Sequence, residues 1–201
     1  MEKILLAEFI GIMLGDGNLY CNNKGQYVIR ITGDLNKDKK YHEDFISNLF
    51  YGLFNKEMRV QIYPDRRVLC CYSKHIFDQL ISFGLKHGNK LENNVGISDW
   101  IFDDDKYVMA CLRGLIDTDG SVFPKSTNKE FFQIEISCAI PNLRESISQA
   151  FQKLDIKSSN WSEGSNTPNC GIYKKEEIFK YCRLIGFNNP TKGNKFKASV
   201  V

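Results

Sequence analysis

The chain has 201 residues, 42% of them hydrophobic, so it can bury a core as one domain or as two of ~100 residues each. No apolar run approaches the ~20 residues of a membrane span and no cleavable signal sequence is recognisable. We therefore expect an intracellular protein, of the cytoplasm or an organelle matrix, with no membrane partner. Its formal net charge of +3 points only weakly to nucleic acid. Its seven cysteines have no CxxC spacing, which favours buried free thiols over disulfides or a zinc ribbon.

The first predicted element is an apolar helix. Its run from Leu5 to Leu14 is interrupted only by Glu8, and Gly17 stands where a left-handed C-terminal cap favours a residue without Cβ. Periodicity then predicts, in chain order, a strand at Tyr27–Thr32, a helix at Asn36–Phe54, strands at Met58–Tyr63 and Val68–Tyr72, a helix ending at Gly84 and a linker at Asn93–Trp100.

The same series then begins again. A second helix runs from Tyr107 to Ile116 and stops at Gly120, and three aspartates before it supply capping and favourable charge at its positive end. After it we predict a strand at Phe132–Ser137, a helix at Pro141–Leu154, strands at Ser158–Ser162 and Cys170–Tyr173, and a helix ending at Gly186. The sequence thus predicts two αββαββα units, residues 1–98 and 99–201.

Two nine-residue stretches, FIGIMLGDG at 9–17 and LRGLIDTDG at 112–120, are versions of one motif. Each carries small residues at helical i, i+4 spacing, namely Gly11 with Gly15 and Gly114 with Thr118. Glycine inside a helix costs about 1 kcal/mol relative to alanine, so close approach of two backbones is the simplest compensating gain. We expect these residues to form the interface between two packed helices.

That packing would bring Asp16 and Asp119 together at the two helix C-termini. The helix dipole disfavours a carboxylate there by about 0.3–1 kcal/mol. Two acids held close to each other and to two negative helix ends make a site for divalent cations. Either motif alone could be an ordinary helix-ending Asp-Gly turn, but both occur in one register, which argues against that interpretation.

These residues resemble the LAGLIDADG homing endonucleases, in the single-chain form with two motifs. The second motif matches the family name at seven of nine positions and departs at Arg113 and Thr118. The first keeps the second acid as Asp16 but has Leu14 and Gly15 where the name has Asp and Ala. The family's metal-binding acid is the second Asp of the motif, so both catalytic positions are filled.

The resemblance implies that Asp16 and Asp119 are catalytic and bind the metal, with Gly15 and Thr118 as further metal-binding residues. It also implies basic residues that order the attacking water. Lys90 and Lys192 each lie six residues after a helix-ending glycine and match that role, with Lys195 as a competitor of Lys192.

Lys37, four residues after the strand end at Gly33, looks like a third basic member of the catalytic shell that the resemblance implies. Its counterpart by the same offset is Asn142, which is uncharged. The shells of the two sites are therefore expected to differ, and the two DNA strands to break at different rates.

Strand-rich units with helices on one face imply an α+β fold whose antiparallel sheets each have a free face. The resemblance implies two pseudo-twofold-related αββαββα halves that form a DNA-binding saddle, with the motif helices at the central interface. In Met58–Tyr63, alternation is expected to bury Met58, Val60 and Ile62 and to present Arg59, Gln61 and Tyr63.

Arg, Gln, Asn and Glu are the residues that base edges in the major groove select, although any one of them alone is more simply a solvated side chain. The DNA-binding candidates are Lys24, Arg30, Arg59, Gln61, Tyr63, Arg66 and Arg67 in the first unit, and Lys125, Gln133, Glu135, Asn160, Ser162 and Lys174 in the second.

The predicted function is metal-dependent cleavage of double-stranded DNA at a long asymmetric target by a monomer. Each unit hydrolyses one phosphodiester, leaving short 3′ overhangs as the family does. Mg²⁺ is the expected cofactor, as two or three divalent ions, with Mn²⁺ or Ca²⁺ able to substitute in binding. The serious alternative is an intron maturase that binds its host intron RNA on the same fold.

Other classes fit less well. A DNA-binding regulator that has lost cleavage is disfavoured because both acids are present. An EF-hand is excluded because Leu115 and Ser126 would occupy its first and twelfth positions. An intein is disfavoured because the chain has no terminal His-Asn.

Overall fold

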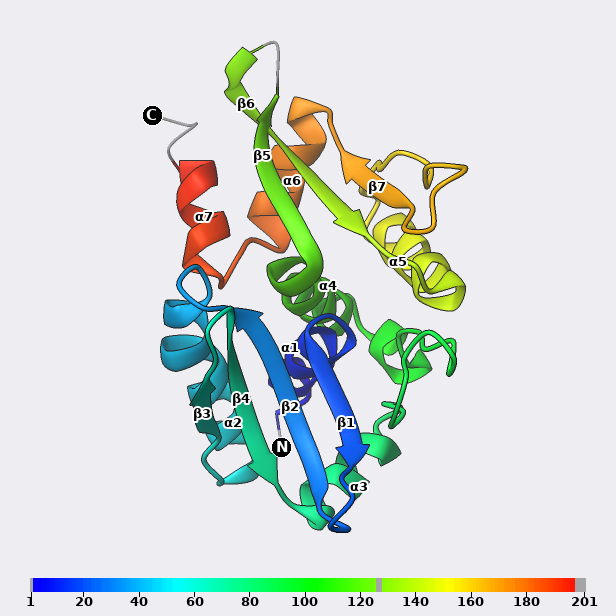
Figure 1. The fold of residues 1–201 in the computed structure, drawn as a ribbon. Coiled ribbons are helices and arrows are strands. Elements are labelled where there is room, and N and C mark those ends of the chain that lie inside the picture. Colours follow the sequence, from blue (N-terminus) through cyan, green and yellow to red (C-terminus); the bar gives the residue numbers. More distant parts are fainter. Residues whose placement is uncertain (1, 126–127, 198–201) are drawn as a thin grey trace.

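A computed structural model describes residues 2–125 and 128–197 and has an α+β architecture. Figure 1 shows helices α1 (Lys3–Leu14) and α4 (Asp105–Asp119) at the centre, with one antiparallel sheet on each side of the pair. The predicted fold class, two αβ halves meeting at the motif helices, is confirmed. Among the described residues, no helix has the length and apolarity needed to cross a membrane.

The first half has the predicted order of elements. A four-stranded sheet has the strand order β1-β2-β4-β3, and its connections include a π-helical segment, η1, that leads into α2. The bounds are β1 Gly17–Cys21, β2 Tyr27–Asp34, η1 Tyr41–Ile46, α2 Ser47–Phe54, β3 Arg59–Ile62, β4 Arg66–Tyr72 and α3 Lys74–Ser82.

The second half departs from the predicted order by one strand and one helix. Its sheet has three strands in the order β5-β6-β7, and an unpredicted helix, α7, follows α6. The bounds are η2 Asp99–Asp103, a 3₁₀ turn, then α4, β5 Gly120–Lys125, β6 Asn128–Ser137, α5 Pro141–Lys153, β7 Asn169–Ile172, α6 Lys175–Leu184 and α7 Pro190–Lys197.

The prediction of a strand at Ser158–Ser162 is wrong. This segment runs beside β7 and makes two backbone hydrogen bonds to it, from the Ser159 and Ser162 amides. Between them, the Trp161 indole N–H turns away to the Ser148 hydroxyl of α5, at 2.9 Å. The Asn169 and Gly171 amides of β7 donate to the Ser162 and Ser159 hydroxyls, both at 3.0 Å, and not to backbone carbonyls, so the segment stays irregular.

The two central helices pack as the glycine spacing predicts. A Cβ on Gly11 would overlap the carbonyl oxygen of Cys111, and one on Gly114 would overlap that of Glu8. A Cβ on Gly15 would overlap the Thr118 hydroxyl. The apolar core continues through both halves around this contact. All seven cysteines are free, and the predicted burial holds for five of them.

Strand β3 lies at the sheet edge, and its predicted burial is wrong at two positions. Val60 and Ile62 are 45% and 62% exposed, whereas Met58 is buried. An edge strand has a neighbour on one side only, so alternation along it does not guarantee burial. The register still places Arg59 opposite Cys70 and Gln61 opposite Val68.

The predicted linker is fixed to the second half. Asn142, at the start of α5, donates from its backbone amide to Asn94 Oδ1 at 3.1 Å and from its side chain to the Asn94 carbonyl at 3.2 Å. The Ile97 amide donates to Ser146 Oγ at 3.2 Å. The linker is therefore part of the packed structure.

Candidate active site

The two motif acids meet where α1 and α4 end. A Cβ built on Gly15 would lie 3.4 Å from the carboxyl carbon of Asp119, which places this carboxyl group directly against the backbone next to Asp16. The Asp16 carbonyl accepts a hydrogen bond from the Thr32 amide of β2 at 3.1 Å, which ties the turn to the first sheet. The close helix packing thus brings together two acids that are far apart in sequence.

Lys90 and Lys192 cap the two helices in matching ways. Lys90 Nζ donates to the carbonyls of Met13, Leu14 and Gly15, at 2.9 Å for Leu14. Lys192 Nζ donates in the same way to the carbonyls of Ile116, Asp117 and Thr118, at 2.7, 2.8 and 2.9 Å.

An ammonium group has three N–H donors, and each of these lysines directs all three at helix carbonyls. Their positive charges therefore offset the negative helix ends on which the acids stand. Lys195 donates to the Val122 carbonyl at 3.0 Å instead, so the geometry matches Lys192, not Lys195, with Lys90. Ordering of water by these N–H groups, as predicted, would require them to leave the carbonyls.

The electrostatic environment of the acids favours a bound cation. Burial, together with the negative charges of Asp119 and Asp38, raises the pKa of Asp16 to about 7, while the positive charges of Lys192 and Lys90 oppose the rise. Burial also raises the pKa of Asp119, while Lys90 and Lys192 oppose it. A divalent cation between such carboxylates would relieve the repulsion.

The donor set fits magnesium in particular. Within 2–125 and 128–197, no three His, Cys, Asp or Glu side chains gather closely enough to hold a metal by themselves. Mg²⁺ characteristically takes one or two carboxylates and completes its octahedron with waters and substrate phosphates. Asp16 and Asp119 match that pattern.

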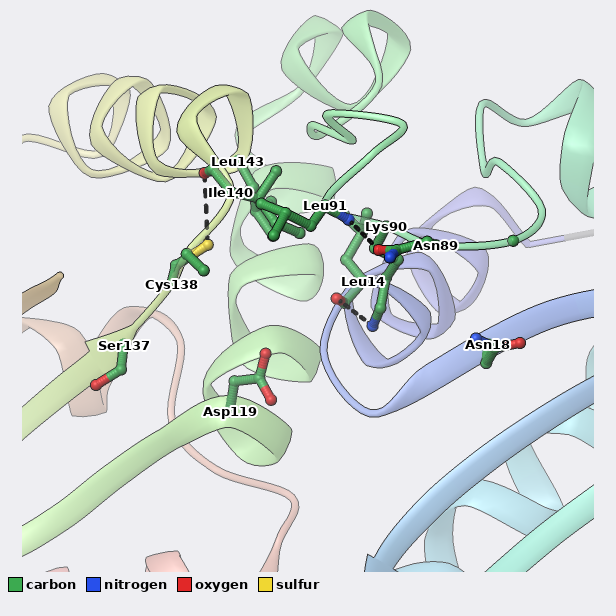
Figure 2. Close-up of a pocket in the computed structure, with 12 residues that line it drawn as sticks. Leu14, Asn18, Asn89, Lys90, Leu91, Asp119, Ser137, Cys138, Ile140 and Leu143 are labelled. Atoms are coloured by element: carbon green, nitrogen blue, oxygen red, sulfur yellow. Dashed lines mark hydrogen bonds between the residues drawn. The ribbon is translucent and has the colours of Figure 1, made fainter. Parts of the chain in front are cut away.

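Two open pockets lie at the helix ends, and Asp119 lines the larger of them. The larger, about 620 Å³, is lined by residues that include Asp119, Lys90, Cys138, Leu91 and Leu143 (Figure 2). The other, about 350 Å³, has a polar and charged lining that includes Lys37, Asp38, Thr118, Ser121, Asn189, Lys192 and Lys195.

The walls of the two pockets differ at equivalent positions. Ile31 opposite Gly17 in the first sheet corresponds to Ile136 opposite Gly120 in the second. Six residues further on, Lys37 corresponds to Asn142, which is turned toward the linker. The next residue is Asp38 in one half and the buried Leu143 in the other. The predicted inequality of the two shells is thus present in the structure and extends beyond Lys37.

Comparison with known proteins agrees with this geometry. Residues 106–186 match the family model of the LAGLIDADG-like domain. The chain has the LAGLIDADG fold. The structure of I-DmoI in complex with DNA and Mn has a TM-score of 0.69 and 17% identity, covering 92% of this chain and 97% of that one. The structure of I-DmoI in complex with DNA and Ca has a TM-score of 0.69 and 16% sequence identity, and the match covers 98% of both chains.

The N-terminal LAGLIDADG domain of DUF199/WhiA shares the fold as well, with a TM-score of 0.59 and 15% identity over 92% of this chain and 82% of that one. No curated protein sequence matches the chain. At sequence identities of 15–17%, the similarity to these solved structures shows the fold alone.

A buried polar network joins the two LAGLIDADG helices and explains Arg113, which departs from the motif. Arg113 donates from Nε and Nη2 to the two carboxylate oxygens of Glu8, at 2.9 and 2.6 Å, and Glu8 is 1% exposed. Asn188 Nδ2 donates to the same carboxylate at 2.5 Å. A neutral small residue at 113 would leave Glu8 buried without this partner.

Asp117, the first acid of the second motif, has a structural role. Its Oδ2 accepts hydrogen bonds from the Asn188 and Asn189 amides at 2.7 and 3.0 Å, just before α7. Burial raises the pKa of Asp117 to about 7 even so. Sequence reasoning missed this contact, although the match of this Asp to the family motif marked the position.

The free face of the first sheet carries most of its predicted DNA-binding residues. Arg30 and Arg59 both lie opposite Cys70, one from each neighbouring strand, so their side chains share one face. Tyr63 donates to Gln61 Oε1 at 3.2 Å, and the Arg66 guanidinium lies 4.9 Å from the Tyr63 ring. Lys24 is exposed in the turn between β1 and β2.

The prediction for Arg67 is wrong. It is 1% exposed, pairs with Glu43 at 2.5 Å, and donates to the Leu35 carbonyl at 3.3 Å. In β4 it alternates with Arg66 and lies opposite Ile62, so it points to the helix side of the sheet. An arginine there needs a carboxylate partner, which η1 supplies.

In the second sheet, Gln133 and Glu135 lie opposite Phe123 and Ser121 on one face. Glu135 accepts a hydrogen bond from the Tyr173 hydroxyl at 2.6 Å, and the Tyr173 ring covers Gly171. Three other candidates of this half lie outside the strands. Asn160 and Ser162 are exposed in the irregular segment, and Lys174 is exposed before α6. The side chain of Lys125 lies outside the described residues.

Proposed function

We propose that the protein is a site-specific, metal-dependent endonuclease that recognises a long asymmetric duplex target. Each half hydrolyses one phosphodiester, so the products carry short 3′ overhangs. The observation that carries the proposal is the pair of acids at the adjoining helix ends, which are capped by two lysines and bordered by two pockets. The similarity to I-DmoI, whose structures hold DNA with Mn or Ca, supports it.

Asp16 and Asp119 would hold the divalent cations, for which Mg²⁺ is the natural choice, with the Gly15 and Thr118 carbonyls beside them. Such cations polarise the phosphate and neutralise the departing 3′ oxygen. Lys90 and Lys192 offset the helix-end charge so that both acids can ionise. The pockets admit water and the scissile phosphates from the two strands.

The free sheet faces would read the DNA. Arg59, Gln61 and Arg30 in the first half and Gln133 and Glu135 in the second have the chemistry that major-groove base edges recognise. Four strands in one half and three in the other give the two halves different surfaces. Such unequal surfaces suit an asymmetric target bound by a monomer.

The test begins with a randomised duplex library, from which the protein with Mg²⁺ selects sequences whose newly formed ends are captured and sequenced. We expect one long consensus, with the two cuts offset to leave short 3′ overhangs, and no products in EDTA. Failure to enrich any cleaved sequence under Mg²⁺ or Mn²⁺ would contradict the proposal. Tight binding of a structured intron RNA without cleavage of duplex DNA would support the maturase alternative.

A further inference from the structure

Asp38 is held in the smaller pocket by contacts from both halves of the molecule. Its Oδ2 accepts a hydrogen bond from the Asp34 amide at the end of β2, at 2.8 Å. Its Oδ1 accepts one from Asn189 Nδ2 at 3.1 Å. Asn189 is 1% exposed, and the same amide also donates to the Asp117 carbonyl of α4 at 3.1 Å. The carboxylate is thus anchored to the first sheet and to the second LAGLIDADG helix.

The anchored carboxylate remains open to water. Asp38 is only half-buried and lines the pocket together with Thr118 and Lys192. Each carboxylate oxygen has two acceptor positions, so one on each oxygen is left after the two anchoring bonds. The same carboxylate is near enough to Asp16 to raise the pKa of that acid.

The equivalent position in the other half is Leu143, which is 2% exposed and cannot accept a proton. Cys138 there donates its thiol hydrogen to the Ile140 carbonyl at 3.6 Å, as Figure 2 shows, and burial raises its pKa. Among the residues that line the larger pocket, Asp119 is the one carboxylate. The larger pocket therefore has a motif acid as its one carboxylate, whereas the one carboxylate that lines the smaller pocket is Asp38.

We propose that Asp38 is a catalytic residue of one site only, where its carboxylate accepts the proton of the attacking water. The proposal rests on the endonuclease function above. The water oxygen bonds to phosphorus as the bond from phosphorus to the 3′ oxygen breaks. One water proton passes to Asp38, and the departing 3′ oxygen takes a proton from solvent. The strand that lies in the smaller pocket is cut first.

The test measures each strand separately, under single-turnover conditions, on a duplex labelled at both 5′ ends. General-base catalysis is worth roughly 10²–10⁴-fold, so Asp38→Ala should slow the first strand by about 100-fold or more and leave the second-strand rate within about twofold. Added formate, which can occupy the space of the lost carboxylate, should restore part of the first-strand rate.

Two further variants separate chemistry from folding. Asp38→Asn keeps the size of the side chain and should give the same strand-specific loss without rescue by formate. Asp155→Asn removes a remote acid that pairs with Lys180 and should cut both strands at wild-type rates. Equal slowing of both strands by Asp38→Ala, or no slowing of either, would overturn the assignment of Asp38 while leaving the endonuclease function intact. A wild-type protein that cuts neither strand would overturn both.

Discussion

The two halves of the molecule are alike at the helix ends and unlike around them. Both end a central helix at an Asp-Gly, and both cap its carbonyls with a lysine from late in the half, Lys90 from a loop and Lys192 from α7. Around these ends, one pocket has Lys37 and Asp38, and the other has Leu143 with Asn142 turned away. Under the proposed function, the symmetric part would hold the metal and the asymmetric part would set the order of the cuts.

Part of the interface between the halves also breaks the symmetry. The Glu8–Arg113 pair has no twin, because the repeat places Cys111 and Ile10 at the corresponding positions. Arg113→Met should destabilise the protein by about 3–5 kcal/mol, since it leaves the Glu8 carboxylate buried without its partner. Urea unfolding of the purified protein measures the change.

The double variant Glu8→Met with Arg113→Met is the control for that prediction. It removes both charges, so we expect it to recover most of the lost stability. If the double variant loses as much free energy of unfolding as the two single variants together, the two residues do not act as a coupled ion pair.

The symmetric part of the interface is tested at its glycines. Gly11→Ala places a Cβ into the Cys111 carbonyl, and the resulting overpacking should cost about 2–3 kcal/mol despite the better helix propensity of alanine. Gly52→Ala is the matched control, because this glycine lies in α2 with open space around the added Cβ. Gly52→Ala should stabilise the protein by about 0.5–1 kcal/mol. Similar melting temperatures for both variants would contradict the close helix contact.

The unequal sheets can be compared through base recognition. Arg59 lies on the free face of the four-stranded sheet, so Arg59→Ala should relax specificity at a few adjacent base pairs, by about 1–3 kcal/mol of discrimination. Lys24→Ala, by contrast, should weaken binding evenly across sequences and lower the salt slope by about one. A cleavage profile over all single-base variants of the target distinguishes the two. An unchanged profile for Arg59→Ala would show that another face reads the groove.

The charge repulsion at the helix ends predicts a pH effect in metal-free buffer. Because folding raises the pKa of Asp16 from 3.8 to about 7, the native state binds the extra proton and loses stability as pH rises through this window. The two proteins should match only below about pH 3.8, and between pH 5 and 7.5 Asp16→Asn should gain ~1–2 kcal/mol of stability relative to the wild type, since solvent access reduces the ~4 kcal/mol of a fully buried group.

Comparison with the variant is needed because His42 acts in the opposite sense. Burial lowers its pKa to about 4, so in both proteins it removes stability as pH falls below 6.5. Thermal melts of the two proteins from pH 5 to 7.5 cancel this contribution. A difference that shrinks as pH rises would contradict the electrostatic account.

Sequence was sufficient for the features that repeat in register. The paired glycines predicted the helix contact, and the family resemblance, with the matching spacing of Lys90 and Lys192, predicted both lysines. What it could not predict depends on contacts between distant segments. Arg67 reads as a surface arginine until Glu43 is placed beside it, and Asp38 reads as a loop residue until Asn189 anchors it. The segment just before helix α7 is held by hydrogen bonds to Asp117, and local periodicity cannot predict such a contact between distant residues.

The most direct test of the two-acid site compares Asp16→Asn and Asp119→Asn with the wild type on the selected target. Loss of a metal ligand removes several kcal/mol of transition-state stabilisation, so each variant should lose double-strand cleavage by about 1,000-fold or more. Specific binding, measured by gel shift in Ca²⁺, should persist, because neither change disturbs the helix contact. Wild-type cleavage rates in either variant would contradict the central role of this pair.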